Sequence, residues 1–325
     1  MTDSDVAAAP TSAPSVATEE ARRERRAQIL DVIIVVSNGA LKHIRPCLAS
    51  LREHPLTTGG MTVHVVDNAS TDGTADVIAR EFPEVDLERL TWNSGFCIAN
   101  NILLARTTAP YALVLNPDTV MFGGTLDRMV QLMEQRPDIG VAGCRLIQPD
   151  GTFDHAAKRS FPTPVGALAH FTGLGRRSGA GRRLGQYRAT ELGEHDCGEV
   201  DAVNGAFMVV RRSAMEQVGL MDETYWLYMD DLDWCYRFKQ RGWKVWYEGA
   251  VSAIHVKGGT TVEARRRGRH RGLRHNLAFH RGMGRFYRKF YAGRRPLVDV
   301  VIYLAIGAKF LFSATRSTIA RRSVR

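Results

Sequence analysis

Three carboxylates fall within four positions of the segment YMDDLDWCYRF, residues 228–238. Asp230, Asp231 and Asp233 repel one another, yet aromatic side chains surround them, which favours a partly buried setting over a solvated surface. Crowded carboxylates beside apolar rings can hold a metal, act as a general base or bind a cation. The alternative is that they stabilise the amino terminus of a helix, which explains one or two of the three better than all of them.

If a helix begins near residue 230, Asp230 and Asp233 share one face and Asp231 lies about 100° around the axis from them. A neighbouring carboxylate and apolar rings can raise the pKa of a carboxyl group, as a general base requires. His255, near the end of a predicted strand, could complete a metal site, although a single histidine is more often structural.

A second pair of polar residues, Asn116 and Asp118, lies in LNPDTV at the end of a predicted strand. Pro117 ends that strand, and alternate residues of an extended chain point the same way, so both side chains could face one ligand. Oxygen ligands suit Mg²⁺ or Mn²⁺, which take one or two carboxylates together with substrate phosphates. The alternative is a polar strand exit with an ordinary turn.

The segment DNASTDGT, residues 67–74, follows a buried strand and precedes a helix. Asp67 could accept hydrogen bonds from a nucleobase or ribose, whereas Asn68, Ser70 and Asp72 could instead only cap the turn and the helix. No GxGxxG motif occurs here, so dinucleotide binding of the Rossmann type is not supported.

Strand and helix patterns alternate from residue 31 onward. Continuous β-branched runs predict buried parallel strands, and apolar residues at helical spacing predict the helices between them. The strands are expected at 31–37, 62–68, 86–92, 111–118 and 139–147, and the helices at 41–54, 74–82, 97–108 and 124–138. This alternation predicts a doubly wound α/β sheet, whose ligand crevice lies beyond the carboxyl ends of the strands.

Length and composition set further limits. The 325 residues, 44% of them apolar, allow one large domain or two moderate ones. No unbroken apolar run reaches the roughly 18 residues of a spanning helix, and no signal-peptide pattern is found. Five scattered cysteines without a CxxC pair favour reduced thiols in a cytoplasmic protein.

Charge is distributed unevenly along the chain. Residues 263–325 carry 17 Lys and Arg against two acidic residues, a net charge of +15, so the preceding 262 residues sum to −5. We therefore expect a polyanionic partner for this segment: lipid headgroups, nucleic acid or a diphosphate. The chain divides into a disordered arm (1–28), an α/β domain (29–262) with a long excursion or mobile loop at 155–198, and a basic helical extension (263–325).

The last part of the extension shows helical spacing of apolar residues, at Leu297, Val300, Val301, Leu304, Ala308, Leu311 and Phe312. Asp299 and Lys309 interrupt it, and about 15 residues are too few to span a bilayer. Such a helix could lie in an anionic membrane interface or pack on its own domain. Nucleic acid is disfavoured as the partner because no recognition fold accompanies the arginines.

Seven segments resemble, in order, the family 2 glycosyltransferases with a GT-A fold. They are VIIVVSN, DNASTDGT, NSGFCIANN, LNPD, VNGAFMVVRR, GLMDETYWLYMDDLDWCYRFKQRGWKVWY and AIHVKGG. The chain is most similar to the rhamnosyltransferase-like branch of cell-envelope enzymes, over about residues 30–260. Any one of these motifs is weak evidence for the resemblance, but seven of them in the same order are strong evidence. The resemblance implies a mostly parallel, mixed α/β sheet of the GT-A type.

The resemblance also implies roles for individual positions. Asp231 would be the general base, as part of the pair Asp230–Asp231, and Asp118 the main metal ligand, with His255 completing the shell. Donor binding would fall to Ser37, Asn38, Asp67, Asn93, Gly95, Asn100 and Asn116, and the acceptor side to Asp230, Asn204, Gly205 and Trp234. The family's first strand usually ends Ser-Tyr-Asn, but this chain has Ser37-Asn38-Gly39. The tyrosine that would stack on the nucleobase is therefore missing.

The function implied is an inverting glycosyltransferase of cell-envelope polysaccharide synthesis. It would move a sugar, with rhamnose favoured, from a dTDP or UDP donor to a glycan or lipid-linked acceptor, using Mg²⁺ or Mn²⁺. It would be cytoplasmic and could bind the inner face of the plasma membrane. One alternative is a sugar-nucleotide nucleotidyltransferase, although SNGALKH is a poor triphosphate loop. Another is a catalytically silent module that binds glycans or nucleic acid.

Overall fold

A computed structural model describes residues 27–163, 192–256 and 269–319 of the chain. Three of the sequence expectations therefore lie wholly or mostly outside the described residues. They are the disordered arm over 1–28, most of the excursion over 155–198, and the boundary between the α/β domain and the extension at residue 262.

Nine described strands form one mixed sheet, in the order β3-β2-β1-β4-β10-β6-β11-β5 with β8 paired to β11. Their bounds are β1 Gln28–Val36, β2 Gly60–Asp67, β3 Asp86–Arg89, β4 Tyr111–Leu115, β5 Thr119–Met121, β6 Ile139–Ile147, β8 Gly198–Glu199, β10 Phe207–Arg211 and β11 Lys244–His255. A separate pair consists of β7 Lys158–Arg159 and β9 Ala202–Val203.

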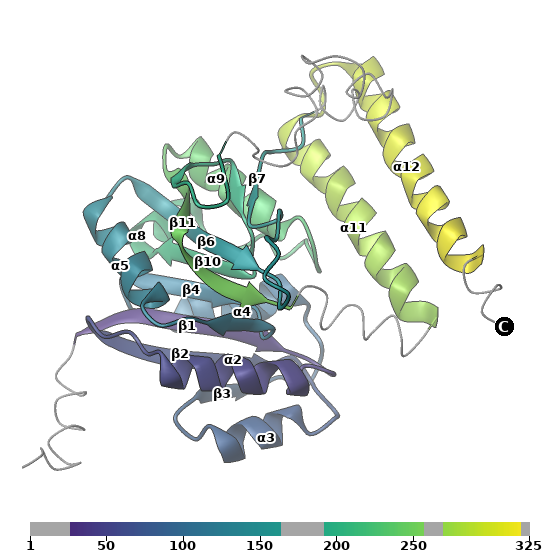
Figure 1. The fold of residues 1–325 in the computed structure, drawn as a ribbon. Coiled ribbons are helices and arrows are strands. Elements are labelled where there is room, and N and C mark those ends of the chain that lie inside the picture. Colours follow the sequence, from purple (N-terminus) through teal and green to yellow (C-terminus); the bar gives the residue numbers. More distant parts are fainter. Residues whose placement is uncertain (1–26, 164–191, 257–268, 320–325) are drawn as a thin grey trace, which may run out of the picture.

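Helices pack around this sheet, except for the last two, which form a hairpin to one side of it (Figure 1). They are α2 Leu41–Glu53, α3 Thr74–Glu81, α4 Phe96–Arg106, α5 Thr125–Gln135, α8 Arg212–Val218, α9 Asp230–Gln240, α11 Arg269–Phe290 and α12 Pro296–Ile319. The predicted alternation of strands and helices up to residue 147 is confirmed, with element ends shifted by a few residues.

The central strands are buried on both sides, which explains their continuous apolar sequence. In β1, Val32, Ile33, Ile34 and Val36 have no exposed surface, and all five residues of β4 are buried. A strand covered by helices on both faces cannot alternate apolar with polar residues. β1 therefore forms the centre of the parallel part of the sheet, with β2 on one side and β4 on the other.

The ends of these strands gather the polar loops at one edge. β1, β2 and β4 are parallel, so residues 37–38, 67–68 and 116–118 leave the sheet on the same side. β10 runs antiparallel to β4 with Phe207 opposite Leu115, so the 204–206 turn before β10 lies at this edge as well.

The expectation that Asn116 and Asp118 lie on one extended strand is wrong. β4 ends at Leu115, and the next residues form a turn in which the Thr119 N–H donates to the Asn116 carbonyl at 3.2 Å. β5 then pairs with β11, which places Thr119 opposite His255. Strand pairing, rather than alternation along one strand, brings Asp118 next to His255.

The basic extension forms a helical hairpin of α11 and α12. α12 has 24 residues, and its Pro296–Thr315 stretch has a mean hydropathy of 1.9, long and apolar enough to cross a membrane by length and composition alone. The expected apolar length of about 15 residues was therefore too short. The interrupting Asp299 accepts hydrogen bonds from the Tyr287 hydroxyl at 2.5 Å and the Gly293 N–H at 2.9 Å, so it fastens the hairpin.

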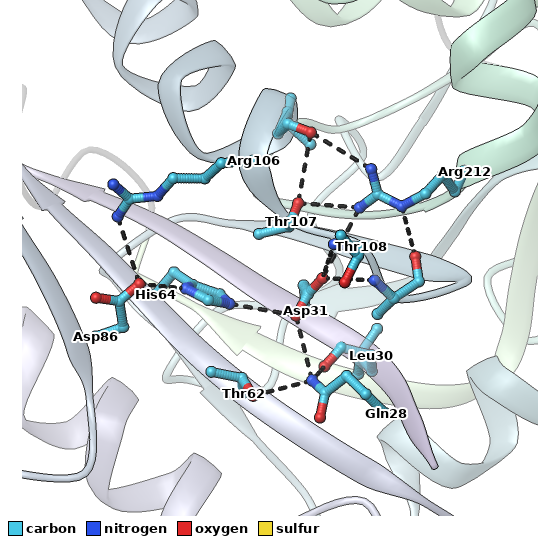
Figure 2. Close-up of polar contacts among 12 residues, drawn as sticks. Gln28, Leu30, Asp31, Thr62, His64, Asp86, Arg106, Thr107, Thr108 and Arg212 are labelled. Carbon is cyan, nitrogen blue, oxygen red and sulfur yellow. Dashed lines mark hydrogen bonds and ion pairs between the residues drawn. The ribbon is translucent and has the colours of Figure 1, made fainter.

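A polar network fastens β1, β2 and β3 near the beginning of β1 (Figure 2). Asp31 Oδ2 accepts hydrogen bonds from the N–H groups of Thr108 and Ala109, at 3.1 and 2.9 Å. The His64 ring bridges two carboxylates, with Nε2 at 3.2 Å from Asp31 Oδ1 and Nδ1 at 2.7 Å from Asp86 Oδ2. Three neighbouring strands thus share one charged network.

Burial and hydrogen bonding shift the pKa of His64 in opposite directions. Burial alone would lower the pKa of His64, but hydrogen bonds to Asp31 and Asp86 outweigh it and raise that pKa above the ordinary 6.5. A histidine whose pKa is higher in the folded state than in the unfolded state contributes its full stabilisation at pH values below the unfolded-state pKa. It loses that contribution as pH rises through the folded value.

We predict that His64→Gln lowers the free energy of unfolding by about 1–3 kcal/mol near pH 5.5, because the charge-assisted hydrogen bonds are lost. Above the raised pKa of His64 the difference from wild type should shrink. Urea unfolding at about pH 5.5 and about pH 9 measures it. His195→Gln, whose side chain is 66% exposed, is the matched control. An equal deficit at both pH values would contradict this account of the network.

Candidate active site

Asp67, the last residue of β2, has an unused acceptor. Its side chain is buried, and Oδ2 accepts a hydrogen bond from the Ser70 N–H at 3.1 Å. Oδ1 is also buried and has no hydrogen-bond partner among the described residues. Buried acceptors are nearly always satisfied in folded proteins, so this atom is suited to an N–H donor from a bound molecule.

The loops after β1 and β2 are tied together. Asn38 Oδ1 accepts a hydrogen bond from the Thr71 N–H at 2.8 Å, and the Gly39 N–H donates to Asp72 Oδ2 at 2.6 Å. Asp72 Oδ1 also accepts from the N–H and the hydroxyl of Thr74, at 3.2 and 2.6 Å, so this residue orders the turn before α3, whose N-cap residue is Gly73. Ser37 is half-buried at the end of β1. These contacts hold the loops around Asp67 in place.

Gly95 brings the loop before α4 against the segment before α9. Its φ is +87°, and a Cβ there would lie 2.6 Å from the Trp226 ring, so glycine is required. The Phe96 N–H donates to the Trp226 carbonyl at 3.0 Å. Asn93 Oδ1 accepts from the Gly95 N–H at 3.2 Å, and Asn68 donates to the Gly95 carbonyl at 3.0 Å.

Two predicted site residues lie in the interior instead. Asn100 is 1% exposed and its amide donates to the Phe96 carbonyl one turn earlier in α4. Trp234 is fully buried, and its indole N–H donates to the Gly219 carbonyl at 2.9 Å. The buried Trp234 ring has no surface to offer an acceptor, so that expected contact is corrected. The Asn100 Oδ1, like the Asp67 Oδ1, is buried without a hydrogen-bond partner among the described residues, so its donor contact stays a prediction.

Asp118 and His255, the two predicted metal ligands, lie next to each other. His255 Nε2 lies 3.6 Å from Asp118 Oδ1, and both side chains are buried. His255 Nδ1 lies 3.2 Å from Asp154 Oδ2, which fixes the ring. A carboxylate behind a histidine is typical of a metal-binding histidine.

This donor set fits a divalent cation that is shared with a substrate. No group of three or more His, Cys, Asp or Glu suited to a metal occurs in the described part of the chain. Mg²⁺ and Mn²⁺ are commonly held by one or two protein ligands, with substrate phosphates and water supplying the rest. Asp118 and His255 provide such a pair.

Asp231 is held by three hydrogen bonds, one of which is also an ion pair with Arg159. Oδ2 accepts from Arg159 Nη2 at 2.5 Å and from the Gly205 N–H at 3.1 Å, and Oδ1 accepts from the Leu232 N–H at 2.8 Å. The Arg159 and Asp231 side chains are only 9% and 13% exposed. Arg159 is not predicted as a site residue from the sequence, because it lies 72 positions from Asp231 and carries no local signal.

The 204–206 turn connects the loop that carries Asp118 to Asp231. The Ala206 carbonyl accepts hydrogen bonds from the Asn116 N–H at 3.0 Å and the Thr119 hydroxyl at 3.2 Å. The preceding residue, Gly205, donates to Asp231, and Asn204 Oδ1 accepts from the Ala206 N–H at 2.9 Å. The loop that carries Asp118 and the start of α9 therefore both contact one short turn.

The three clustered aspartates have different surroundings. Asp233 is fully buried and pairs with Arg237 and with Lys289 of α11, each at 2.7 Å. Asp230 is buried at the start of α9, and burial followed by the charge of Asp231 raises its pKa. Asp231 alone faces the turn before β10.

Two residues directly before α9 adopt a strained backbone. Tyr228 and Met229 have φ of +68° and +69°, the left-handed region that non-glycine residues rarely occupy. Such strain persists only where surrounding contacts hold it, and it is concentrated at functional sites. The position of Asp230 and Asp231 thus depends on packing around this turn.

Comparisons with known proteins agree with one another. A family model described as glycosyl transferase family 2 matches residues 31–219. The N-acetylglucosaminyl-diphospho-decaprenol L-rhamnosyltransferase of Mycobacterium tuberculosis is 28% identical over 240 residues, which are 70% of this chain and 76% of that protein. Rhamnosyltransferase WbbL of Escherichia coli is 27% identical over 50% of this chain and 60% of its own length.

A solved structure supports the fold. Mannosyltransferase PcManGT from Pyrobaculum calidifontis, in complex with GDP-Man and Mn²⁺, superposes with a TM-score of 0.51 at 18% identity. The alignment covers 95% of this chain and 82% of that one. The predicted GT-A fold with C-terminal helices is confirmed.

We predict that Asp230→Asn raises the melting temperature at pH 8 more than at pH 5. A buried carboxyl whose pKa is raised above the ordinary 3.8 destabilises the fold progressively as pH rises from that value to the folded one. Asn removes this penalty.

The matched control is Asp222→Asn, where the sign is opposite. Burial alone would raise the pKa of Asp222, but hydrogen bonds from Lys289 and Thr224 lower it to about 2. The ionised Asp222 therefore stabilises the fold above about pH 4, so Asp222→Asn should have a lower melting temperature than the wild type at pH 8. Thermal unfolding of both variants, monitored by circular dichroism, checks the pair. A gain for Asp230→Asn that does not grow with pH would refute the raised pKa.

Proposed function

Because this chain belongs to glycosyl transferase family 2, in its rhamnosyltransferase-like branch, we propose that it is an inverting, metal-dependent rhamnosyltransferase of cell-envelope polysaccharide synthesis. The donor is a nucleotide diphosphate sugar, with dTDP-rhamnose favoured over UDP sugars. The acceptor is a hydroxyl of a lipid-linked glycan, by extension from the lipid diphosphate named in the mycobacterial relative. The reaction takes place on the cytoplasmic side.

One observation carries the proposal. The loop holding Asp118 and the carboxylate of Asp231 both contact the 204–206 turn at the carboxyl edge of the sheet. A transferase needs a leaving-group side and an acceptor side around one sugar carbon, and this turn lies between two such sets of residues. Asp67, at the end of β2, would accept a hydrogen bond from the nucleobase.

Asp231 acts as the general base in this mechanism. The acceptor oxygen attacks the anomeric carbon while the bond from that carbon to the diphosphate breaks, and Asp231 takes the hydroxyl proton. A single displacement inverts the configuration. Arg159, Gly205 and Leu232 hold the carboxylate in one orientation, and unused lone pairs remain for the proton.

Asp118 and His255 would hold Mg²⁺ or Mn²⁺, with Asp154 orienting the His255 ring. When bound, the ion would neutralise the charge that develops on the diphosphate leaving group. Asn116, Ser37 and Asn38 are proposed to line the donor side, and Asp230, Asn204 and Gly205 the acceptor side.

We predict that Asp231→Asn lowers kcat about a hundredfold or more, since a general base contributes at least that factor. Donor affinity, measured by calorimetry, should fall much less than kcat, because Asn keeps the shape of the side chain even though Arg159 loses its ionic partner. Asp150→Asn, in an exposed turn, is the control. Wild-type turnover by Asp231→Asn would remove the base assignment.

We predict that dTDP stabilises the wild type against heat more strongly when Mn²⁺ is present, because ligand binding to the folded state raises stability. Asp118→Asn should abolish this Mn²⁺-dependent increment and keep the Mn²⁺-independent one. Asp154→Asn should weaken Mn²⁺ binding about 10–100-fold, through the loss of ring orientation. The proposed metal side is disproved if both variants respond to Mn²⁺ as the wild type does.

Hydrolysis of dTDP-rhamnose without acceptor separates an enzyme from a silent binding module. We expect slow, Mn²⁺-dependent release of rhamnose by the wild type. Bound donor that is never cleaved, with or without a lipid-linked acceptor, would favour the binding module.

A further inference from the structure

We propose that the α11–α12 hairpin docks this protein on a bilayer that contains anionic lipid. In this arrangement α12 lies along the membrane surface and its outer face enters the boundary between headgroups and acyl chains. The docking surface consists of the exposed apolar residues of α12.

α12 exposes a continuous apolar stripe. The stripe consists of Leu297, Val300, Val301, Leu304, Leu311 and Phe312, with exposed fractions of 83%, 56%, 45%, 69%, 63% and 64%. Intervals of three, four and seven residues place these side chains on one side of a helix. Contiguous exposed apolar surface of this kind marks an interaction site in a folded protein.

The opposite side of α12 is covered by α11. Ile302 is 3% exposed, the Tyr303 ring lies 5.6 Å from the Tyr287 ring, and Phe310 lies 5.6 Å from His280. The Ser313 hydroxyl donates to Asn276 Oδ1 at 3.2 Å. These contacts run along the whole hairpin, so the stripe faces away from the protein, and α12 is the outermost element of this side (Figure 1).

The positive charges beside the stripe favour an anionic membrane surface as its partner. Arg294 and Arg295 are exposed directly before α12, and Arg274, Arg281 and Arg288 are exposed at seven-residue intervals along one face of α11. Positive side chains beside an apolar helix face are the composition of helices that bind anionic lipid at the interface. A second copy of this basic hairpin would instead bring like charges together.

The hairpin geometry favours a helix that lies on the membrane over one that spans it. α12 is long and apolar enough to span. However, α11 packs along it and carries the row of arginines, so a spanning α12 would draw guanidinium groups into hydrocarbon. α11 is also attached to the α/β domain and cannot enter the bilayer with its partner.

α11 connects the docking surface to the start of the catalytic helix. Lys289 pairs with Asp233 of α9 and with Asp222, at 2.7 and 2.6 Å, and the Phe290 ring lies 4.1 Å from Tyr236. Gly282 lets α11 approach the strained turn, since a Cβ there would lie 3.1 Å from Met229. Docking would therefore hold Asp231 at a fixed place relative to the membrane. The benefit for a lipid-linked acceptor rests on the proposed function, but the docking does not.

Flotation of the full chain with vesicles tests the proposal without measuring activity. We expect binding to phosphatidylcholine vesicles that contain phosphatidylglycerol, weaker binding to phosphatidylcholine alone, and a decrease with added salt. The double variant L304S/F312S should lower the partition coefficient about a hundredfold, because two exposed apolar side chains are lost. F122S removes an apolar side chain that is 40% exposed outside the hairpin and should bind as the wild type does.

Three results would overturn the proposal. The wild type could fail to bind vesicles containing phosphatidylglycerol at low salt. The double variant could bind as well as F122S. Sedimentation could show a dimer that L304S/F312S abolishes, without vesicle binding, which would make a second copy the occupant of the stripe. Circular dichroism of each variant verifies that α12 remains helical.

Discussion

The buried ion pair between Arg159 and Asp231 is the contact on which the arrangement of the site depends. Arg159 also donates to the Val203 carbonyl, so one guanidinium joins β7, β9 and the start of α9. Removing one partner of such a pair typically costs about 3–5 kcal/mol, because the other charge stays buried alone. The same contact fixes the 204–206 turn, and through that turn the loop that holds Asp118.

Environment, and not residue type, distinguishes the three aspartates at the start of α9. Asp233 is neutralised by two cations and joins α9 to α11. Asp230 is buried beside a like charge, which favours its protonated form. Asp231 has an arginine and two backbone N–H groups, and it faces the turn before β10. A single charge-rich segment therefore serves packing and the proposed chemistry at once.

The sequence predicts the parallel part of the sheet well, because the continuous apolar runs of β1 and β4 occur only where both faces are covered. It also predicts the edge where the site forms, since parallel strands end on the same side. It could not predict that Thr119 pairs with His255, or that Arg159 reaches Asp231, because both depend on long-range packing. Trp234 was misplaced for a related reason: a short aromatic segment does not show which face of α9 enters the core. Individual roles came from the family resemblance, not from periodicity.

The unsatisfied Oδ1 of Asp67 has a consequence for the evolution of the chain. A buried acceptor without a donor among the described residues lowers the stability of the ligand-free protein by about 1–3 kcal/mol. A bound nucleobase that donates to this atom would remove this stability cost, and the recovered free energy would strengthen nucleotide binding. Selection for heat resistance alone would favour a residue at position 67 that leaves no buried acceptor unpaired, at the expense of the proposed nucleobase contact.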